Sequence, residues 1–418
     1  MRKSSTWWLY KLFIIFLMLT SFHAWMFWSW NSNIFFWLFV SMVSTFIYLG
    51  NRKWYKHTNL KNEIVWFIIL QMTLVLTAFG LNFAGTVYLL IPSWTVFPVL
   101  MLKDEYKTDL FSTTYIGIAS ILTISLVGWF LFLGGVSLPY EMVEYGVDDL
   151  YYFENYHLFL RNTTMLSGLL LFPRFSSIFL EPGYLGCMVS LLLFIHRYKK
   201  GFWTIVLLIT QFLTFSVAGW LISIFGYIAL RSSNSKHRFL IITSILAVFF
   251  MIWWGAKTIN DGNNMVNIAF FERISFDSSK GTIVGYDRST EQTDEWFWSS
   301  FVMSPNNLYG EPDAVDRLAI NDNDWKSYII RHGLVGFGAF LLFALYPYFS
   351  VPKGKRHSRI PVLTLCIMYC LIFAQTIHMI FSVMYLVFLS LGVSIVREQD
   401  ETNNIILNKS VKNGQDYL

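Results

Sequence analysis

The chain has 418 residues, of which 55% are hydrophobic and 19% aromatic, but only 14% carry a charge. A soluble protein carries nearly twice that fraction of charged residues, and the mean hydropathy is +0.49. This composition excludes an ordinary soluble globular protein and predicts a polytopic membrane protein. The formal net charge of +5 is no indication of nucleic-acid binding, because a membrane protein sorts its charges by side of the bilayer.

The sequence predicts an all-α bundle of about twelve membrane helices. Runs long enough, or nearly so, to cross about 30 Å of hydrocarbon occur throughout the chain, and the first is expected to be a retained helix because no small-x-small cleavage site follows it. The twelve runs are 12–28, 34–49, 64–81, 87–102, 113–133, 182–196, 202–217, 220–230, 239–256, 327–349, 360–377 and 379–396. Within 202–230, residues 214–219 are expected to form a tight turn or a break in a helix.

Loop charge predicts the orientation of this bundle. With the N-terminus inside, most of the 31 lysines and arginines fall in the inner loops, as the positive-inside rule requires. Both termini are therefore expected in the cytoplasm. The expected order is helices 1–5 (1–134), a first large outer loop (135–174), helices 6–9 (175–256), a second large outer loop (257–326), helices 10–12 (327–396) and a cytoplasmic tail (397–418). We expect short helices and irregular segments in the two outer loops.

The segment from Arg174 to Gly186 places a cation and a carboxylate where a membrane helix begins. Proline favours the first position of a helix, so Pro182 predicts a helix start with Glu181 at the N-cap. Ionisable groups at the mouth of a membrane helix are costly, which favours a functional role. Capping by Glu181, with Arg174 as a surface counter-ion, is the alternative.

Other ionisable residues occur in the second outer loop and the helix after it. Arg288 is a further candidate phosphate ligand, because the planar fork of arginine matches an oxyanion; a structural ion pair with Asp287 or Glu291 is the alternative. Asp324 ends a D-x-D pattern that resembles a metal dyad only weakly, and capping of the next helix is the simpler interpretation. Arg331 and His332 lie further into that helix and are expected to face a polar cavity.

Three of these segments together resemble the O-antigen polymerase and ligase superfamily. The first is the Arg174…Glu181-Pro182-Gly183 run, and the second is the Leu213–Trp220 run, which is similar to the Ser-rich helix turn of that superfamily. The third ends the large outer loop, at residues 324–336. The resemblance covers roughly residues 174–349 and the layout of the helices. Each motif is short, so the resemblance depends on the order of the three motifs in the chain and on their expected position at the outer face of the membrane.

The resemblance implies a metal-independent membrane glycosyltransferase of the GT-C type, without a cofactor. Such an enzyme joins glycans carried on undecaprenyl diphosphate at the outer face of the bacterial inner membrane. Polymerases of the Wzy type extend the glycan by lipid-linked repeats, for O-antigen or capsule, whereas ligases transfer it to lipid A-core. Ligases typically carry a histidine in the last motif. Here the corresponding positions read Asn321, Asn323 and Asp324, which favours a polymerase.

The family chemistry assigns roles to the candidate residues. Arg174 and Arg288 are expected on the diphosphate, and Glu181 or Asp324 as the base that takes the proton of the acceptor hydroxyl. Arg331 and His332 are expected to contribute to substrate binding. The implied partners are the lipid-linked oligosaccharide and membrane lipid, with a chain-length regulator and a flippase, and no nucleic acid. Ligase activity and lipid-linked oligosaccharide transport stay open as alternatives.

Overall fold

The computed structural model describes most of the chain. The described residues are 5–55, 60–78, 83–145, 151–163, 173–233, 238–264, 266–272, 274–277, 282–283, 295–317, 325–351, 356–376 and 379–397. Arg288 and Asp324 lie outside these ranges.

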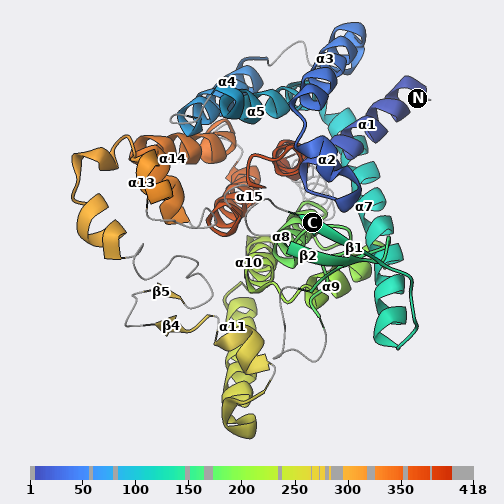
Figure 1. Ribbon diagram of the computed structural model, residues 1–418, viewed down its shortest axis with the longest axis vertical. Coiled ribbons are helices and arrows are strands. Elements are labelled where there is room, and N and C mark those ends of the chain that lie inside the picture. Colours follow the sequence, from blue (N-terminus) through green and yellow to red (C-terminus); the bar gives the residue numbers. More distant parts are fainter. Residues whose placement is uncertain are drawn as a thin grey trace, which may run out of the picture.

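Helices dominate the structure, as predicted (Figure 1). The helices of the N-terminal third are α1 (Ser5–Ser21), α2 (Trp28–Asn31), α3 (Ile34–Gly50), α4 (Leu60–Thr77), α5 (Phe83–Trp94), α6 (Phe97–Met101) and α7 (Asp104–Leu133). The later helices are α8 (Pro182–Ile195), α9 (Phe202–Leu213), α10 (Val217–Ser233), α11 (Arg238–Thr258), α13 (Pro312–Arg317), α14 (Trp325–Phe349), α15 (Arg356–Gln375) and a last helix, Val383–Arg397. Several helices begin or end within a residue or two of the predicted runs.

Two of the described helices, α7 and α14, are long and apolar enough to cross a membrane. The helices Trp25–Asn31 and Ile34–Gly50 meet at an angle of 91°, and they add a third span if the bent pair is counted as one. Seven further apolar helices of the described residues are shorter, with 10–17 residues each. The count of twelve spans is therefore not confirmed. Part of the difference lies in helix breaks. The run 87–102 is interrupted at residues 95–96, between α5 and α6, and Pro98 lies in the first turn of α6, where proline is tolerated.

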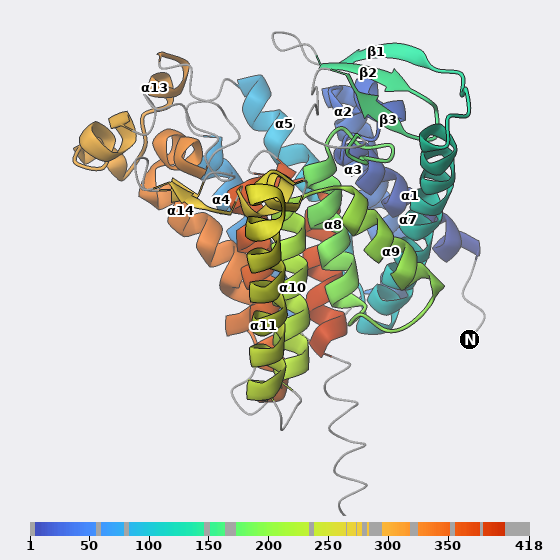
Figure 2. The ribbon, with the colours of Figure 1, turned by 90° about the horizontal axis from the view of Figure 1, so that it is seen from below.

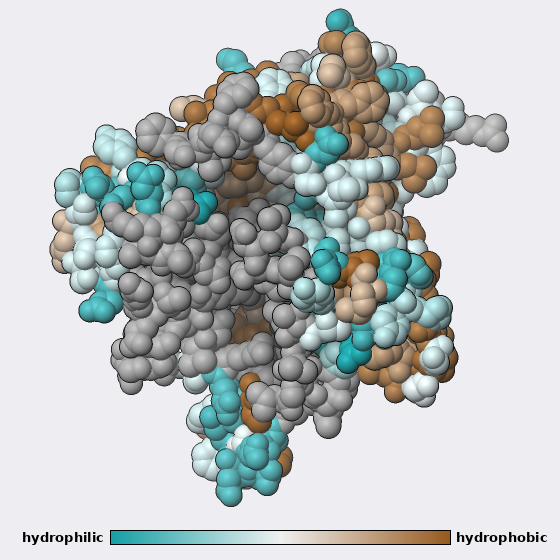
Figure 3. All heavy atoms as spheres, in the orientation of Figure 1, coloured by the Kyte–Doolittle hydropathy of each residue, from teal (hydrophilic) through white to brown (hydrophobic). Residues whose placement is uncertain are grey.

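The surface supports contact with lipid. Large apolar side chains are exposed along α3 and α4, among them Phe35, Phe39, Phe46, Ile68 and Met72. Figure 3 shows hydrophobic side chains gathered over α4 and α5 at the top of the view. An apolar surface of this extent is unusual on a soluble monomer and suits a hydrocarbon environment.

A small sheet in the first predicted loop corrects the expectation of short helices and irregular structure there. Strands β1 (Glu141–Tyr145), β2 (Tyr151–Asn155) and β3 (Leu160–Asn162) form an antiparallel sheet in the order β1-β2-β3. Phe153 and Leu160 are fully buried, whereas Tyr152 is exposed, so one face of the sheet packs on the helices. Figure 2 shows the sheet at one end of the bundle. A second pair, β4 (Phe276–Asp277) and β5 (Thr282–Ile283), lies in the second loop.

Helix α8 forms the centre of the bundle. Every residue from Pro182 to Ile195 is buried, and α8 packs against α9, α10 and α15. Figure 1 shows it enclosed by these helices. A helix that is apolar on all sides is expected at such a position, and its first residues are therefore fixed firmly.

The sheet is joined to the end of α1 by a polar contact. The hydroxyl oxygen of Tyr145 lies 2.7 Å from Nδ1 of His23, and the rings of Tyr145 and Trp28 lie 4.7 Å apart. His23 has a φ of 55° and ends the first helix earlier than the sequence predicts. Burial lowers the pKa of His23 to about 4, because the charged imidazolium loses its solvation.

This lowered pKa predicts a pH dependence of stability. The pKa of a histidine in the unfolded chain is about 6.5, so below that pH the unfolded state binds more protons than the folded state. The stability that the neutral form of His23 contributes to the folded protein is complete above about pH 6.5, and it is lost as the pH falls toward 4. We expect the melting temperature of the wild type to fall more steeply over this window than that of His23→Gln. Parallel curves in thermal unfolding by tryptophan fluorescence would refute this expectation.

Candidate functional site

The segment that precedes α8 is held by backbone hydrogen bonds to three distant parts of the chain. The N–H of Phe175 donates to the carbonyl of Leu213 (3.0 Å), and the N–H of Trp25 donates to the carbonyl of Ile178 (3.0 Å). The N–H of Leu160, in β3, donates to the carbonyl of Ser177 (2.8 Å). Such cross-links hold the start of α8 in one position relative to α1, the sheet and α9.

Arg174 binds the turn between α9 and α10. Its Nε–H donates to the carbonyl oxygen of Thr214 (2.9 Å), and its side chain is half-buried. The turn itself is the predicted break: α9 ends at Leu213, Phe215 has a φ of 46°, and α10 begins at Val217. The structure thus brings the first two sequence motifs into direct contact. The orientation of the guanidinium is set by this backbone anchor.

Glu181 occupies the N-cap position of α8, and Pro182 is the first residue of the helix, as predicted. The backbone of Glu181 is extended (φ −131°, ψ 140°). Its side chain, however, makes no capping hydrogen bond, although a side-chain bond to the first turn is what makes a residue an effective cap. The capping interpretation is therefore supported by the position of Glu181 but not by a capping hydrogen bond from its side chain. Glu181 is half-buried between buried neighbours, Leu180 and Pro182.

Two glycines allow α8 and α10 to approach closely beside this site. A Cβ on Gly219 would lie 2.9 Å from the Cα of Gly186, and a Cβ on Gly186 would lie 2.7 Å from the Cβ of Ser216. The hydroxyl of Ser190 lies 2.8 Å from the carbonyl oxygen of Gly186 and 2.7 Å from that of Gly219, so its single proton can be donated to either helix. The close contact keeps the Thr214 turn against the start of α8.

The second cluster lies on α14, where the helix is bent. Gly333 has a φ of 65° and a ψ of −178°. Residues 308–311 pack against this bend, where the N–H of Val335 donates to the carbonyl of Leu308 (3.0 Å) and the N–H of Glu311 donates to the carbonyl of Ile330 (2.6 Å). Arg331 and His332 directly precede the bend. The bend therefore fixes the positions of both candidate residues.

His332 is 9% exposed, and its ring lies 4.5 Å from that of Tyr328. The hydroxyl of Tyr328 in turn lies 2.8 Å from the hydroxyl of Thr77. Nδ1 of His332 is buried without a hydrogen-bond partner. An unpaired buried nitrogen is costly, which keeps His332 a candidate for binding a polar group.

The two clusters lie on either side of α15. Helix α14 packs against α4 and α15, and α15 packs against α10 and α8, an arrangement that Figure 1 also shows. Arg288 and Asp324 lie outside the described residues, as do Asn321 and Asn323, so the structure does not place them relative to Arg174 or Glu181. In the part of the chain that is described, no three His, Cys, Asp or Glu residues gather as metal ligands would.

Sequence reasoning missed the partner of Arg174. The backbone carbonyl of Thr214 has no side-chain signature, although the resemblance had singled out both segments. It also missed Gly186 and Gly219 as a packing pair. Comparison of the chain with protein families, with curated proteins and with solved structures finds no match.

Proposed function

We propose that the chain is a polysaccharide repeat-unit polymerase of the GT-C type, a metal-independent membrane glycosyltransferase. It would transfer a glycan from undecaprenyl diphosphate to the next lipid-linked repeat at the outer face of the bacterial inner membrane, with both termini in the cytoplasm. The observation that carries the proposal is the hydrogen bond from Arg174 to Thr214. It joins two motifs that are 40 residues apart and that each resemble the polymerase superfamily.

In the proposed reaction, a hydroxyl oxygen of the acceptor sugar attacks the anomeric carbon of the donor glycan. The bond from that carbon to the phosphate oxygen breaks, and undecaprenyl diphosphate leaves with the electron pair. Arg174 stabilises the charge that develops on the phosphate oxygens, with Arg288 assigned to the same group. The proton of the hydroxyl passes to a carboxylate, Glu181 or Asp324.

Three features of the described residues support this assignment. Arg174 lies half-buried beside the start of a buried helix, where a cation interacts more strongly with an anion than it does in water. Its Nε is committed to a carbonyl, which preorganises the planar group. Glu181 is half-buried at the same helix start, which places a carboxylate beside Arg174 in the sequence motif. Arg331 and His332, which directly precede the bend in α14, are assigned to substrate binding.

The glycan made by cells tests this function. In a strain that lacks the chain, we expect surface glycan to carry a single repeat unit, and the wild-type chain should restore a ladder of lengths on a gel. A flippase predicts instead that no repeat reaches the outer face, and a ligase predicts polymer that accumulates on its lipid carrier. Either of these two patterns would overturn the polymerase assignment.

A further inference from the structure

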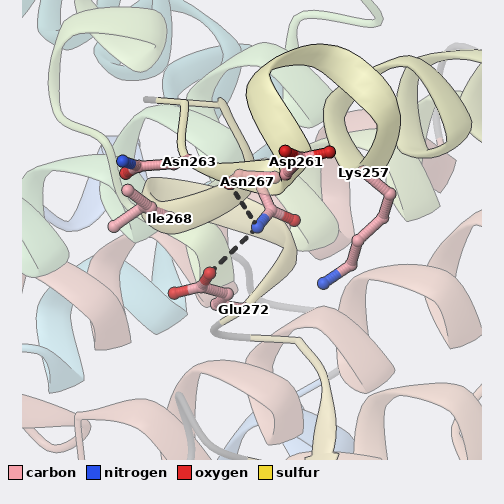
Figure 4. Close-up of a pocket in the computed structure, with 7 residues that line it drawn as sticks. Lys257, Asp261, Asn263, Asn267, Ile268 and Glu272 are labelled. Atoms are coloured by element: carbon pink, nitrogen blue, oxygen red, sulfur yellow. Dashed lines mark hydrogen bonds between the residues drawn. The ribbon is translucent and has the colours of Figure 1, made fainter.

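A polar pocket lies at the C-terminal end of α11, away from the candidate catalytic segment. Its volume is about 390 Å³, in the lower part of the range of small-molecule sites. Figure 3 shows mainly hydrophilic side chains beyond α11, at the bottom of the view. The residues that line the pocket include Lys257, Asp261, Asn263, Asn267, Ile268 and Glu272 (Figure 4).

The pocket is shaped by a turn of left-handed residues. Asn260, Asp261 and Gly262, in η3 (Ile259–Gly262), have φ values of 52°, 49° and 82°. The side chain of Asn264 fastens this turn to α11, since its Nδ2 donates to the carbonyl of Ala256 (2.6 Å). Two successive non-glycine residues in this conformation persist only where their surroundings hold them, and such residues concentrate at ligand clamps and active sites.

Asn267, in the π-helical segment η4 (Asn267–Phe271), is the buried polar group of the pocket, with 2% of its surface exposed. Its Nδ2 donates to the carbonyl of Gly262 (2.9 Å) and to Oε1 of Glu272 (2.9 Å). Its Oδ1 is buried and has no partner, and Figure 4 shows this oxygen on the side toward which Lys257 extends. A buried acceptor without a donor is costly, so a ligand with a donor would satisfy it.

The charges around the pocket restrict the chemistry of that ligand. Asp261 and Glu272 disfavour a phosphate group, and the ammonium of Lys257 disfavours a divalent cation. The lining instead mixes donors and acceptors, including the carboxamide of Asn263. A hydroxyl group both donates and accepts, and a neutral sugar ring carries several of them around a small body.

We propose that this pocket is a carbohydrate-binding subsite that takes one neutral sugar ring of the glycan. Helices α8, α9, α10 and α11 alternate in direction, so the end of α11 that carries the pocket lies at the same end of the bundle as the start of α8 (Figure 2). The identity of the natural ligand, a glycan being extended, rests on the proposed function. The binding of a free sugar does not.

Saturation-transfer NMR on the full-length purified chain tests the subsite, with glucose, galactose, mannose and N-acetylglucosamine as probes. At least one of these sugars is expected to receive saturation from the wild-type protein. Asn263→Ala and Glu272→Gln should each reduce that transfer by about fivefold, the effect of one lost or weakened hydrogen bond. Asn263 is exposed, and glutamine keeps the oxygen that accepts from Asn267, so both variants should fold.

Ser299→Ala is the matched control, because Ser299 is an exposed polar residue of the same loop whose hydroxyl bonds locally, to the carbonyl of Glu295 and the hydroxyl of Ser300. Absence of transfer to every sugar, or equal transfer in the wild type and both pocket variants, overturns the subsite. The ladder of glycan lengths made by cells distinguishes a failure of the sugar subsite from a failure of the proposed polymerase function. A restored ladder without sugar binding removes the subsite alone, and sugar binding without a restored ladder removes the polymerase alone.

Discussion

Replacement of Arg174 by alanine is expected to lower the rate of glycan extension by about 10²–10³-fold, the typical effect of removing one preorganised donor from a site of developing charge. The guanidinium is held by the carbonyl of Thr214 at 2.9 Å, so it needs no reorganisation to meet the diphosphate. Surface ladders from cells that carry Arg174→Ala should collapse to the single repeat, with the protein present in the membrane at wild-type level.

Arg174→Lys distinguishes charge from geometry. Lysine keeps the positive charge but lacks the planar fork, so its ammonium cannot both hold Thr214 in this geometry and present a fork to phosphate. We expect a shortened ladder. Arg161→Ala is the matched control, because Arg161 is an arginine in β3 that pairs with Glu154 at 2.8 Å and belongs to no motif. A full-length ladder in Arg174→Ala would remove the residue from the mechanism, and a collapsed ladder in Arg161→Ala would show that the assay reports folding.

Gly219→Ala is expected to lower the stability of the folded protein by about 3 kcal/mol, the upper part of the range for overpacking. The added Cβ would lie 2.8 Å from the carbonyl carbon and 2.9 Å from the Cα of Gly186. These are backbone atoms, which cannot rotate away. Helices α8 and α10 would have to separate, and the contact between the Thr214 turn and the start of α8 would loosen with them.

Gly183→Ala is the control for this substitution. Gly183 lies in the first turn of α8, where a Cβ would meet no atom within 4 Å, and alanine is the better helix former by about 1 kcal/mol. Thermal unfolding should therefore show a loss for Gly219→Ala and no loss for Gly183→Ala. Equal melting temperatures for Gly219→Ala and the wild type would refute the tight crossing.

The start of α8 was predictable because it depends on local chemistry. Proline fixes φ and lacks the N–H that the first turn of a helix leaves unused, so Pro182 indicates its own position. The turn at residues 214–219 was predictable for a similar reason, since small and polar residues interrupt an apolar run. Both predictions rest on residues that are adjacent in the sequence.

The sheet and the partner of Arg174 were not predictable because they depend on pairing at a distance. Each strand has only three to five residues, and β1 is charged at Glu141 and Glu144, so its alternation is weak. The pairing of Glu141 with Asn155 becomes visible only when the strands meet. The number of spans depended on helix length, and breaks such as that before Pro98 shorten helices which hydropathy alone would continue.

The most direct test of the central claim is extension by the purified chain in lipid nanodiscs, supplied with one repeat unit on undecaprenyl diphosphate and with a metal chelator. The proposed mechanism predicts lipid-linked glycans of two or more repeats, release of undecaprenyl diphosphate, and loss of both with Arg174→Ala. A wild-type protein that is folded, takes up the substrate and yields no glycan longer than one repeat would contradict it.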